Sequence, residues 1–112
     1  MSNGYIAVDL DGTLAYYNEW QGIDKIGEPI PVMLERVKAW IAEGQEVRIF
    51  TARVAVTSKG RADAHAAIRE WCEKHIGTKL KITAEKDFNM IELWDDRCVR
   101  VETNTGKTLS KI

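Results

Sequence analysis

The chain has 112 residues, the size of one compact domain, so we expect one core and not a catalytic domain with a substantial lid. Apolar residues make up 45% and charged residues 29%, an ordinary globular composition that argues against disorder. The 16 basic and 17 acidic residues give a net charge of -1, which excludes a large positive field for nucleic-acid binding but not a local basic pocket. We predict a single domain over 1–112 with no nucleic-acid partner.

The sequence shows no targeting or membrane segment. No apolar run approaches the roughly 20 residues that span a bilayer, and the first residues lack the basic and then apolar regions of a signal peptide. We therefore expect a cytoplasmic protein without a membrane partner. Cys72 and Cys98 form no C-x-x-C pair, so in a reducing compartment both are expected to be free, buried thiols.

The first half of the chain contains one predicted strand and one predicted helix. The apolar run 5–8 predicts a buried strand that ends in the polar sequence Asp-Leu-Asp-Gly-Thr of 9–13. Segment 15–30 has no regular period and predicts a loop or short hairpin. Apolar residues at helical spacing, with proline in the first turn and glycine after the last, predict a helix over 31–43.

A second strand and a second helix follow. Segment 46–50 predicts a strand that leads directly into the polar residues 51–53. An apolar stripe then predicts a helix with Thr57 or Ser58 as its N-cap and Gly77 after its last turn.

Two shorter strands are predicted over 80–83 and 91–94, and the second ends in Asp95 and Asp96. Turn residues flanked by apolar ones predict a closing hairpin over 98–109. The alternation of strands and helices predicts an α/β fold, a three-layer Rossmann-like parallel sheet with flanking helices and right-handed crossovers.

Polar side chains follow the predicted strands where each strand ends. Parallel sheets bind ligands at the carboxyl ends of their strands, so these side chains are expected to meet at one rim. The residues are Asp9, Asp11, Thr51, Arg53, Lys86, Asp95 and Asp96.

The chemistry of this set indicates phosphoryl transfer. The carboxylates of Asp9 and Asp11 repel each other unless a divalent cation lies between them or one carboxyl keeps its proton. Oxygen ligands without clustered His or Cys favour Mg²⁺ over Zn²⁺. Thr51 and Lys86 add the hydroxyl and ammonium donors that a phosphoryl group requires. Together these groups predict an aspartyl-phosphate reaction.

The same residues resemble the four motifs of the haloacid dehalogenase (HAD) superfamily. Residues 9–14, Asp-Leu-Asp-Gly-Thr-Leu, resemble the first motif of its phosphatase branch, and residues 50–53, Phe-Thr-Ala-Arg, resemble the second. Lys86 resembles the third motif, and Asp95 with Asp96 resembles the fourth in its paired-acid form. The resemblance covers essentially the whole chain and implies a HAD-like core of the capless subgroup, since the spacings leave no room for a cap domain.

The resemblance implies a role for each catalytic residue. Asp9 would be the nucleophile, and Asp11 would protonate the leaving oxygen and later activate water. Thr51 and the backbone N–H of Ala52 would bind phosphoryl oxygens, while Lys86 would neutralise charge. Two nearby lysines stay alternatives for the third motif: Lys79 and Lys81.

The resemblance also implies a Mg²⁺ site. Asp9, the backbone carbonyl of Asp11, and Asp95 would hold the ion. Asp96 would either bind through water or orient a neighbouring cation, and we favour the indirect role. Arg53 would contact the substrate or pair with the acids; with Lys59 and Arg61 it supplies enough positive charge for a small anionic substrate.

We therefore expect a Mg²⁺-dependent phosphatase acting on a small phosphorylated metabolite such as a sugar phosphate or nucleotide. Segment 15–30 would be the squiggle and flap beside an open site, which a second copy in a homo-oligomer could enclose. Two alternatives stay open. One is a receiver-like phosphoacceptor, disfavoured because Thr51 stands where a receiver has its acceptor Asp; the other is a non-catalytic module that binds Mg²⁺ or an anion.

Overall fold

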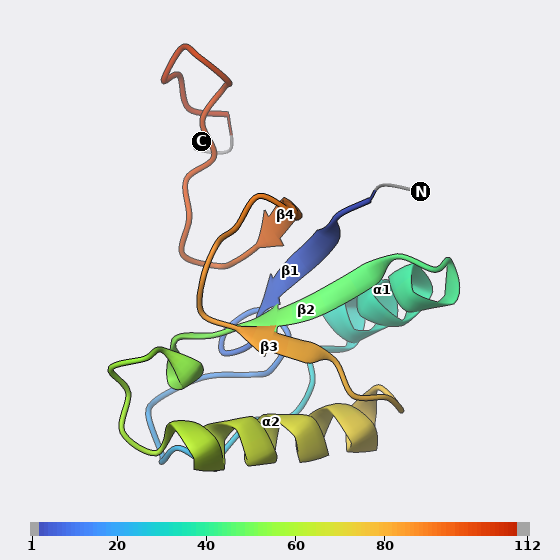
Figure 1. Cartoon of the computed structure of the whole chain (residues 1–112), viewed down its shortest axis with the longest axis vertical. Helices are drawn as coiled ribbons and strands as arrows, with labels where there is room; N and C mark the ends of the chain where they lie inside the picture. Colours follow the sequence, from blue (N-terminus) through green and yellow to red (C-terminus); the bar gives the residue numbers. More distant parts are fainter. Residues whose placement is uncertain (1–2, 110–112) are drawn as a thin grey trace.

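Four parallel strands form one sheet in the computed structural model, which describes residues 3–109 (Figure 1). Their order across the sheet is β3-β2-β1-β4, so β1 and β2 are central and β3 and β4 are the edges. The strands are β1 (Tyr5–Asp9), β2 (Glu46–Phe50), β3 (Lys81–Thr83) and β4 (Met90–Trp94).

Helical segments make the first two crossovers. Helix α1 (Pro31–Ala42) connects β1 to β2, and the short helix η1 (Ala52–Val54) followed by α2 (Arg61–His75) connects β2 to β3. This arrangement confirms the predicted Rossmann-like α/β fold, a parallel sheet with flanking helices and no cap. Within residues 3–109, no helix is both long and apolar enough to cross a membrane.

Both helices pack on the same hydrophobic cluster. Alternate residues of a strand face the same side of a sheet, and the alternate residues Ile6 and Val8 of β1 and Val47 and Ile49 of β2 all belong to this cluster. The helices contribute further buried side chains to it, among them Met33, Val37, Ala64, Ile68, Trp71 and Cys72.

Tyr5 anchors the connection between β3 and β4 at the amino end of β1. Its ring is fully buried, with the guanidinium carbon of Arg48 3.8 Å from the ring centroid. Its hydroxyl donates a hydrogen bond to Asp87 Oδ1 at 3.1 Å. The connection therefore reaches the end of β1 opposite to Asp9.

The predicted strands and helices agree with the observed ones to within one or two residues except at the start of α2. That helix begins at Arg61 rather than after Thr57 or Ser58. The Ser58 hydroxyl instead donates to the carbonyl of Ala52 at 3.0 Å, and Gly60 before the helix takes a φ of 73°. Gly60 therefore occupies the N-cap position, and Ser58, two residues earlier, does not cap the first helical turn.

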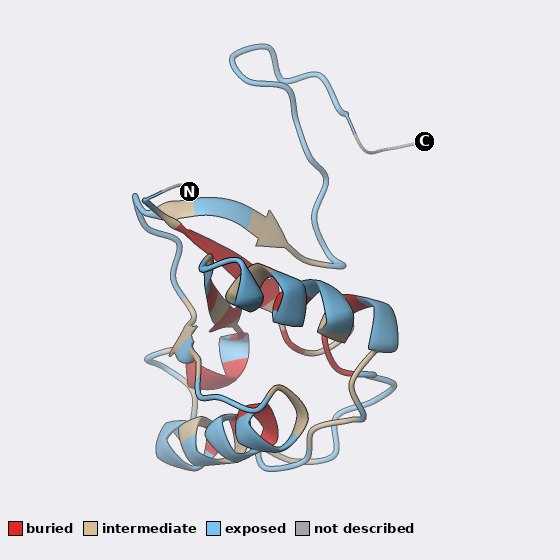
Figure 2. Cartoon of the chain, turned by 90° about the vertical axis from the view of Figure 1, so that its right-hand side faces the viewer, coloured by how far each residue is buried: buried red, intermediate tan, exposed pale blue. Residues whose placement is uncertain are grey.

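The predicted closing hairpin is reduced to a single antiparallel bridge between Val101 and Thr108. The segment after β4 leads away from the sheet, and from Asp96 to Leu109 it is exposed (Figure 2). Cys98 lies in this segment and is exposed, which corrects the expectation of a buried thiol, whereas Cys72 is buried. Both cysteines are free, and burial raises the pKa of the Cys72 thiol to about 12.

Candidate functional site

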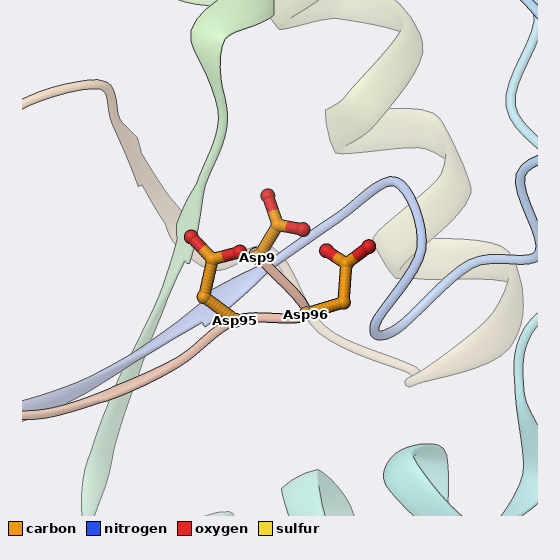
Figure 3. A group of neighbouring side chains, drawn as sticks. All are labelled: Asp9, Asp95 and Asp96. Carbon is orange, nitrogen blue, oxygen red and sulfur yellow. The ribbon is translucent and has the colours of Figure 1, made fainter. Parts of the chain in front are cut away.

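Three carboxylates meet at the carboxyl ends of β1 and β4. Asp9 is the last residue of β1, while Asp95 and Asp96 directly follow β4, the neighbour of β1 in the sheet. One carboxylate oxygen from each lies within 4.8 Å of the other two, and the side chains rise from adjacent chain segments in Figure 3. This carboxylate cluster has the oxygen ligands that suit a hard divalent cation.

The cluster raises the pKa of Asp9 to about 8. Burial of the carboxyl is the largest cause, followed by its hydrogen bond with Asp96 and the negative charges of Asp95 and Asp96. The Thr13 hydroxyl, 3.3 Å from oxygens of both Asp9 and Asp96, acts in the opposite direction. Because the repulsion is between like charges, a bound cation would relieve it, so the donor set fits Mg²⁺.

Asp96, like Asp95, has a carboxylate oxygen within 4.8 Å of the other two acids of the cluster. This position favours direct binding of a cation by Asp96 over the indirect role expected from the sequence. The carboxylate of Asp11 is not in the cluster. It faces Arg53, whose Nε and Nη2 donate to its two oxygens at 2.8 and 3.0 Å. The two acids of segment 9–14 therefore have different partners. Asp9 lies in the cluster, and Asp11 pairs with the buried guanidinium of Arg53.

Arg53 is only 6% exposed, and its guanidinium binds the loop as well as Asp11. Nη1 donates to the carbonyls of Gly22 at 3.2 Å and Ile23 at 2.8 Å, and Nη2 donates to that of Lys25 at 2.8 Å. A guanidinium has five N–H groups, and these bonds use all five. Arg53 therefore holds the loop and Asp11 in place, and in this conformation it has no donor left for the phosphate that the sequence assigned to it.

Segment 15–30 is a loop, as predicted, and its base is closed. An antiparallel bridge joins Ala15 to Pro29, and the Tyr16 N–H donates to the Glu28 carbonyl at 2.8 Å. Trp20 in the same loop stacks on Arg53, with the guanidinium carbon 4.8 Å from the ring centroid, and stays 54% exposed. The loop is thus a fixed wall beside the rim of the sheet.

Thr51 follows β2 and is buried. Its N–H donates to the Thr83 carbonyl at 2.9 Å, and its hydroxyl oxygen accepts from the Arg53 N–H at 3.2 Å. Since that hydroxyl acts here as an acceptor, its hydrogen remains free for donation to an anion.

A cavity of about 390 Å³ brings most of the predicted site together. Its lining includes Asp9, Asp11, Thr51, Ala52, Arg53 and Asp96. Lys59 and Arg97 add positive charge to the same wall, and neither forms an ion pair within residues 3–109.

The structure does not bring Lys86 to this cavity. Lys86 is exposed in the β3–β4 connection, next to the residue that Tyr5 ties to the amino end of β1. The alternatives Lys79 and Lys81 line a different hollow, beside β3. Lys59 is the lysine that the fold places in the cavity.

No protein-family model and no curated protein matches this chain. One similar solved structure is that of a conserved protein from Bacteroides thetaiotaomicron, which is 24% identical with a TM-score of 0.60. The match covers 86% of this chain and 78% of that protein. At this identity the likeness supports the α/β fold alone.

The raised pKa of Asp9 predicts a pH-dependent stability in the absence of divalent cations. The folded protein keeps a proton that the unfolded chain releases, so the free energy of unfolding is expected to fall as the pH rises from about 4 to about 8. Asp9→Asn should remove this fall. At about pH 8 the free energy of unfolding of the variant should exceed that of the wild type by about 1–2 kcal/mol, after allowance for solvent screening. Urea titrations at a series of pH values measure it. The exposed Glu35→Gln serves as control and should keep the wild-type profile; parallel curves for Asp9→Asn and the wild type would contradict the prediction.

Arg53→Gln is expected to destabilise the protein by about 3 kcal/mol or more, because it leaves the Asp11 carboxylate and loop carbonyls without donors. Arg97→Gln, in the same cavity but without an ion pair among the described residues, should change stability by about 0.5 kcal/mol or less. Chemical denaturation compares the two variants. An equal, small effect of both would show that the Arg53 contacts do not hold the loop.

Proposed function

We propose that this protein is a Mg²⁺-dependent phosphomonoester hydrolase of the HAD type, working through an aspartyl phosphate on Asp9. The observation that carries the proposal is the position of Asp9. Its carboxyl belongs to the carboxylate cluster and also lines the cavity that contains Thr51 and Asp11. The proposed nucleophile Asp9, the hydroxyl of Thr51 that would donate a hydrogen bond to phosphate, and the proposed acid Asp11 thus line the same cavity.

The carboxylate cluster would hold the Mg²⁺ ion through Asp9, Asp95 and Asp96. When bound, Mg²⁺ supplies positive charge that favours ionised carboxylates and offsets the charge of phosphoryl oxygens. Ionisation matters here because the carboxyl of Asp9 must be deprotonated to act as a nucleophile, whereas the surrounding acids raise its pKa.

In the first step, an oxygen of Asp9 attacks the phosphorus atom and the bond from phosphorus to the leaving oxygen breaks. Asp11 gives that oxygen its proton, so the product leaves as a neutral alcohol. The hydroxyl of Thr51, the N–H of Ala52 and the ammonium of Lys59 stabilise the charge on the phosphoryl oxygens.

In the second step, water attacks the phosphorus of the aspartyl phosphate, and the bond between phosphorus and Asp9 breaks to release inorganic phosphate. Asp11 takes a proton from the water and returns to its starting state. Both oxygens of Asp11 accept hydrogen bonds from Arg53, and a protonated oxygen has a hydrogen of its own to place. One of these two bonds must therefore open in each cycle.

Hydrolysis of p-nitrophenyl phosphate tests the proposal directly. We expect Mg²⁺-dependent release of p-nitrophenol that chelation abolishes, and no turnover by Asp9→Asn, whose amide cannot form the aspartyl phosphate. Glu35→Gln, an exposed acid on α1, is the matched control and should retain the wild-type rate. An unchanged rate in Asp9→Asn would refute Asp9 as the nucleophile.

The placement of two lysines gives a second test. Lys59→Gln is expected to lower kcat/KM by about 10-fold or more, the effect of losing one charged hydrogen bond to phosphate. Lys86→Gln, which removes the same charge outside the cavity, should leave kcat/KM within about 2-fold of the wild type. The opposite ranking would place Lys86 at the phosphate after all.

A further inference from the structure

We infer that the substrate is the phosphorylated end of a single nucleic-acid strand, bound along a cationic track that runs from the cavity between α2 and β3. The inference rests on the proposed hydrolase function. It revises the expectation drawn from the net charge, because a net charge averages over the surface whereas a strand contacts one face of it.

The track begins with a row of basic residues on α2. Arg61, His65 and Arg69 are spaced four apart, so they share one face of the helix. Burial and the charges of Arg61 and Arg69 together lower the pKa of His65, a sign that the two cations act on the same space. A phosphate placed on this face would be attracted by both guanidinium groups.

The row continues across a hollow beside β3, the edge strand that lies next to α2 in Figure 1. The basic groups that line the hollow are Arg48, His65, Arg69, Lys79 and Lys81, and none of the described residues lining it is acidic. Its positive charge is therefore concentrated on one side of the protein.

Most of this charge is available to a ligand. Arg48 is neutralised by Glu46, whose carboxylate lies 2.7 Å from its Nε. The exposed side chains of Arg69, Lys79 and Lys81 form no ion pair within residues 3–109. Three cations thus face solvent along the junction of α2 and β3.

A second hollow adjoins the first and shares His65 and Thr83 with it. Arg61, His65 and Thr83 line it together with Val54, the last residue of η1. Other residues of η1 line the catalytic cavity. One acid, Glu85, also lines this second hollow. Successive phosphates of a strand on the track would therefore lead to a terminal phosphate at Asp9.

Trp20 favours a single strand over a duplex. The indole lines the catalytic cavity, is 54% exposed, and has the Arg53 guanidinium against it. Proteins that bind single strands combine a basic groove with aromatic rings on which unpaired bases stack, and a base within a duplex has no free face for such stacking.

Fluorescence anisotropy with short labelled oligonucleotides tests the inference, using Asp9→Asn so that no substrate is turned over. The Arg69→Gln/Lys81→Gln double variant should bind a phosphorylated single strand more weakly. Its slope of log affinity against log salt should be shallower by about 1.4, since each lost phosphate contact removes about 0.7. The control Lys38→Gln/Lys107→Gln removes the same charge from exposed positions elsewhere and should behave as Asp9→Asn alone.

A second variant tests base stacking. Trp20→Ala should weaken binding of the single strand by about 5-fold or more, and Trp20→Phe should restore most of the affinity, because stacking contributes about 1–3 kcal/mol per base. Strands phosphorylated at the 5′ or the 3′ end distinguish the two polarities, and the preferred end should be the one that the wild type hydrolyses with Mg²⁺.

Binding no tighter to the oligonucleotide than to a polyglutamate of equal charge would overturn the inference, as would equal effects of the two double variants. The proposed hydrolase function would be refuted by a different result. If the wild type hydrolyses neither p-nitrophenyl phosphate nor the oligonucleotide, that function is refuted, while the anisotropy of Asp9→Asn still decides whether the track binds a strand.

Discussion

The buried guanidinium of Arg53 is the interaction on which the site depends. A buried charge is stable only when it is paired and its hydrogen-bonding groups are satisfied. Asp11 supplies the opposite charge from 42 residues away in sequence, and the loop carbonyls satisfy the remaining donors. Arg53 therefore fixes the loop against the rim and also fixes the orientation of Asp11. If Asp11 is the proton carrier, each transfer is coupled to a contact that also holds the loop.

The order of the strands explains why the acids meet at Asp9. In the sheet β1 lies between β2 and β4, so its carboxyl end has Thr51 on one side and the acids after β4 on the other. Parallel strands place these termini at one rim. Burial first, and then the neighbouring Asp96 and Asp95, raise the pKa of Asp9 and lower stability at neutral pH, a feature that structural packing alone would not favour. A site arranged to receive a cation accounts for it, which is why the cluster supports the proposed Mg²⁺ chemistry.

The numbers of acidic and basic residues are nearly equal, but the two kinds of charge lie on different parts of the protein. Acids gather at the ends of β1 and β4, while cations line the hollow between α2 and β3, where none of the described lining residues is acidic. A sum over 16 basic and 17 acidic residues cannot distinguish this arrangement from an even mixture. Only the packing of α2 beside β3 brings Arg69 next to Lys79 and Lys81, and on that juxtaposition rests our inference of a longer polyanion in place of a small metabolite.

The sequence by itself determined the strands, α1, the parallel α/β class and the acids at the rim, because each follows from local periodicity or from the rule that strand ends converge. Tertiary contacts decided the rest. Lys86 lies outside the cavity, in a connection whose next residue, Asp87, accepts a hydrogen bond from Tyr5. The Arg53 guanidinium binds Asp11 and the loop carbonyls instead of a phosphate. Helix α2 begins at Arg61, after Gly60 with its positive φ, and the Ser58 hydroxyl bonds back to η1. These three positions depend on contacts that local periodicity does not specify. They are therefore set by how the folded chain pairs its charges and satisfies its hydrogen bonds.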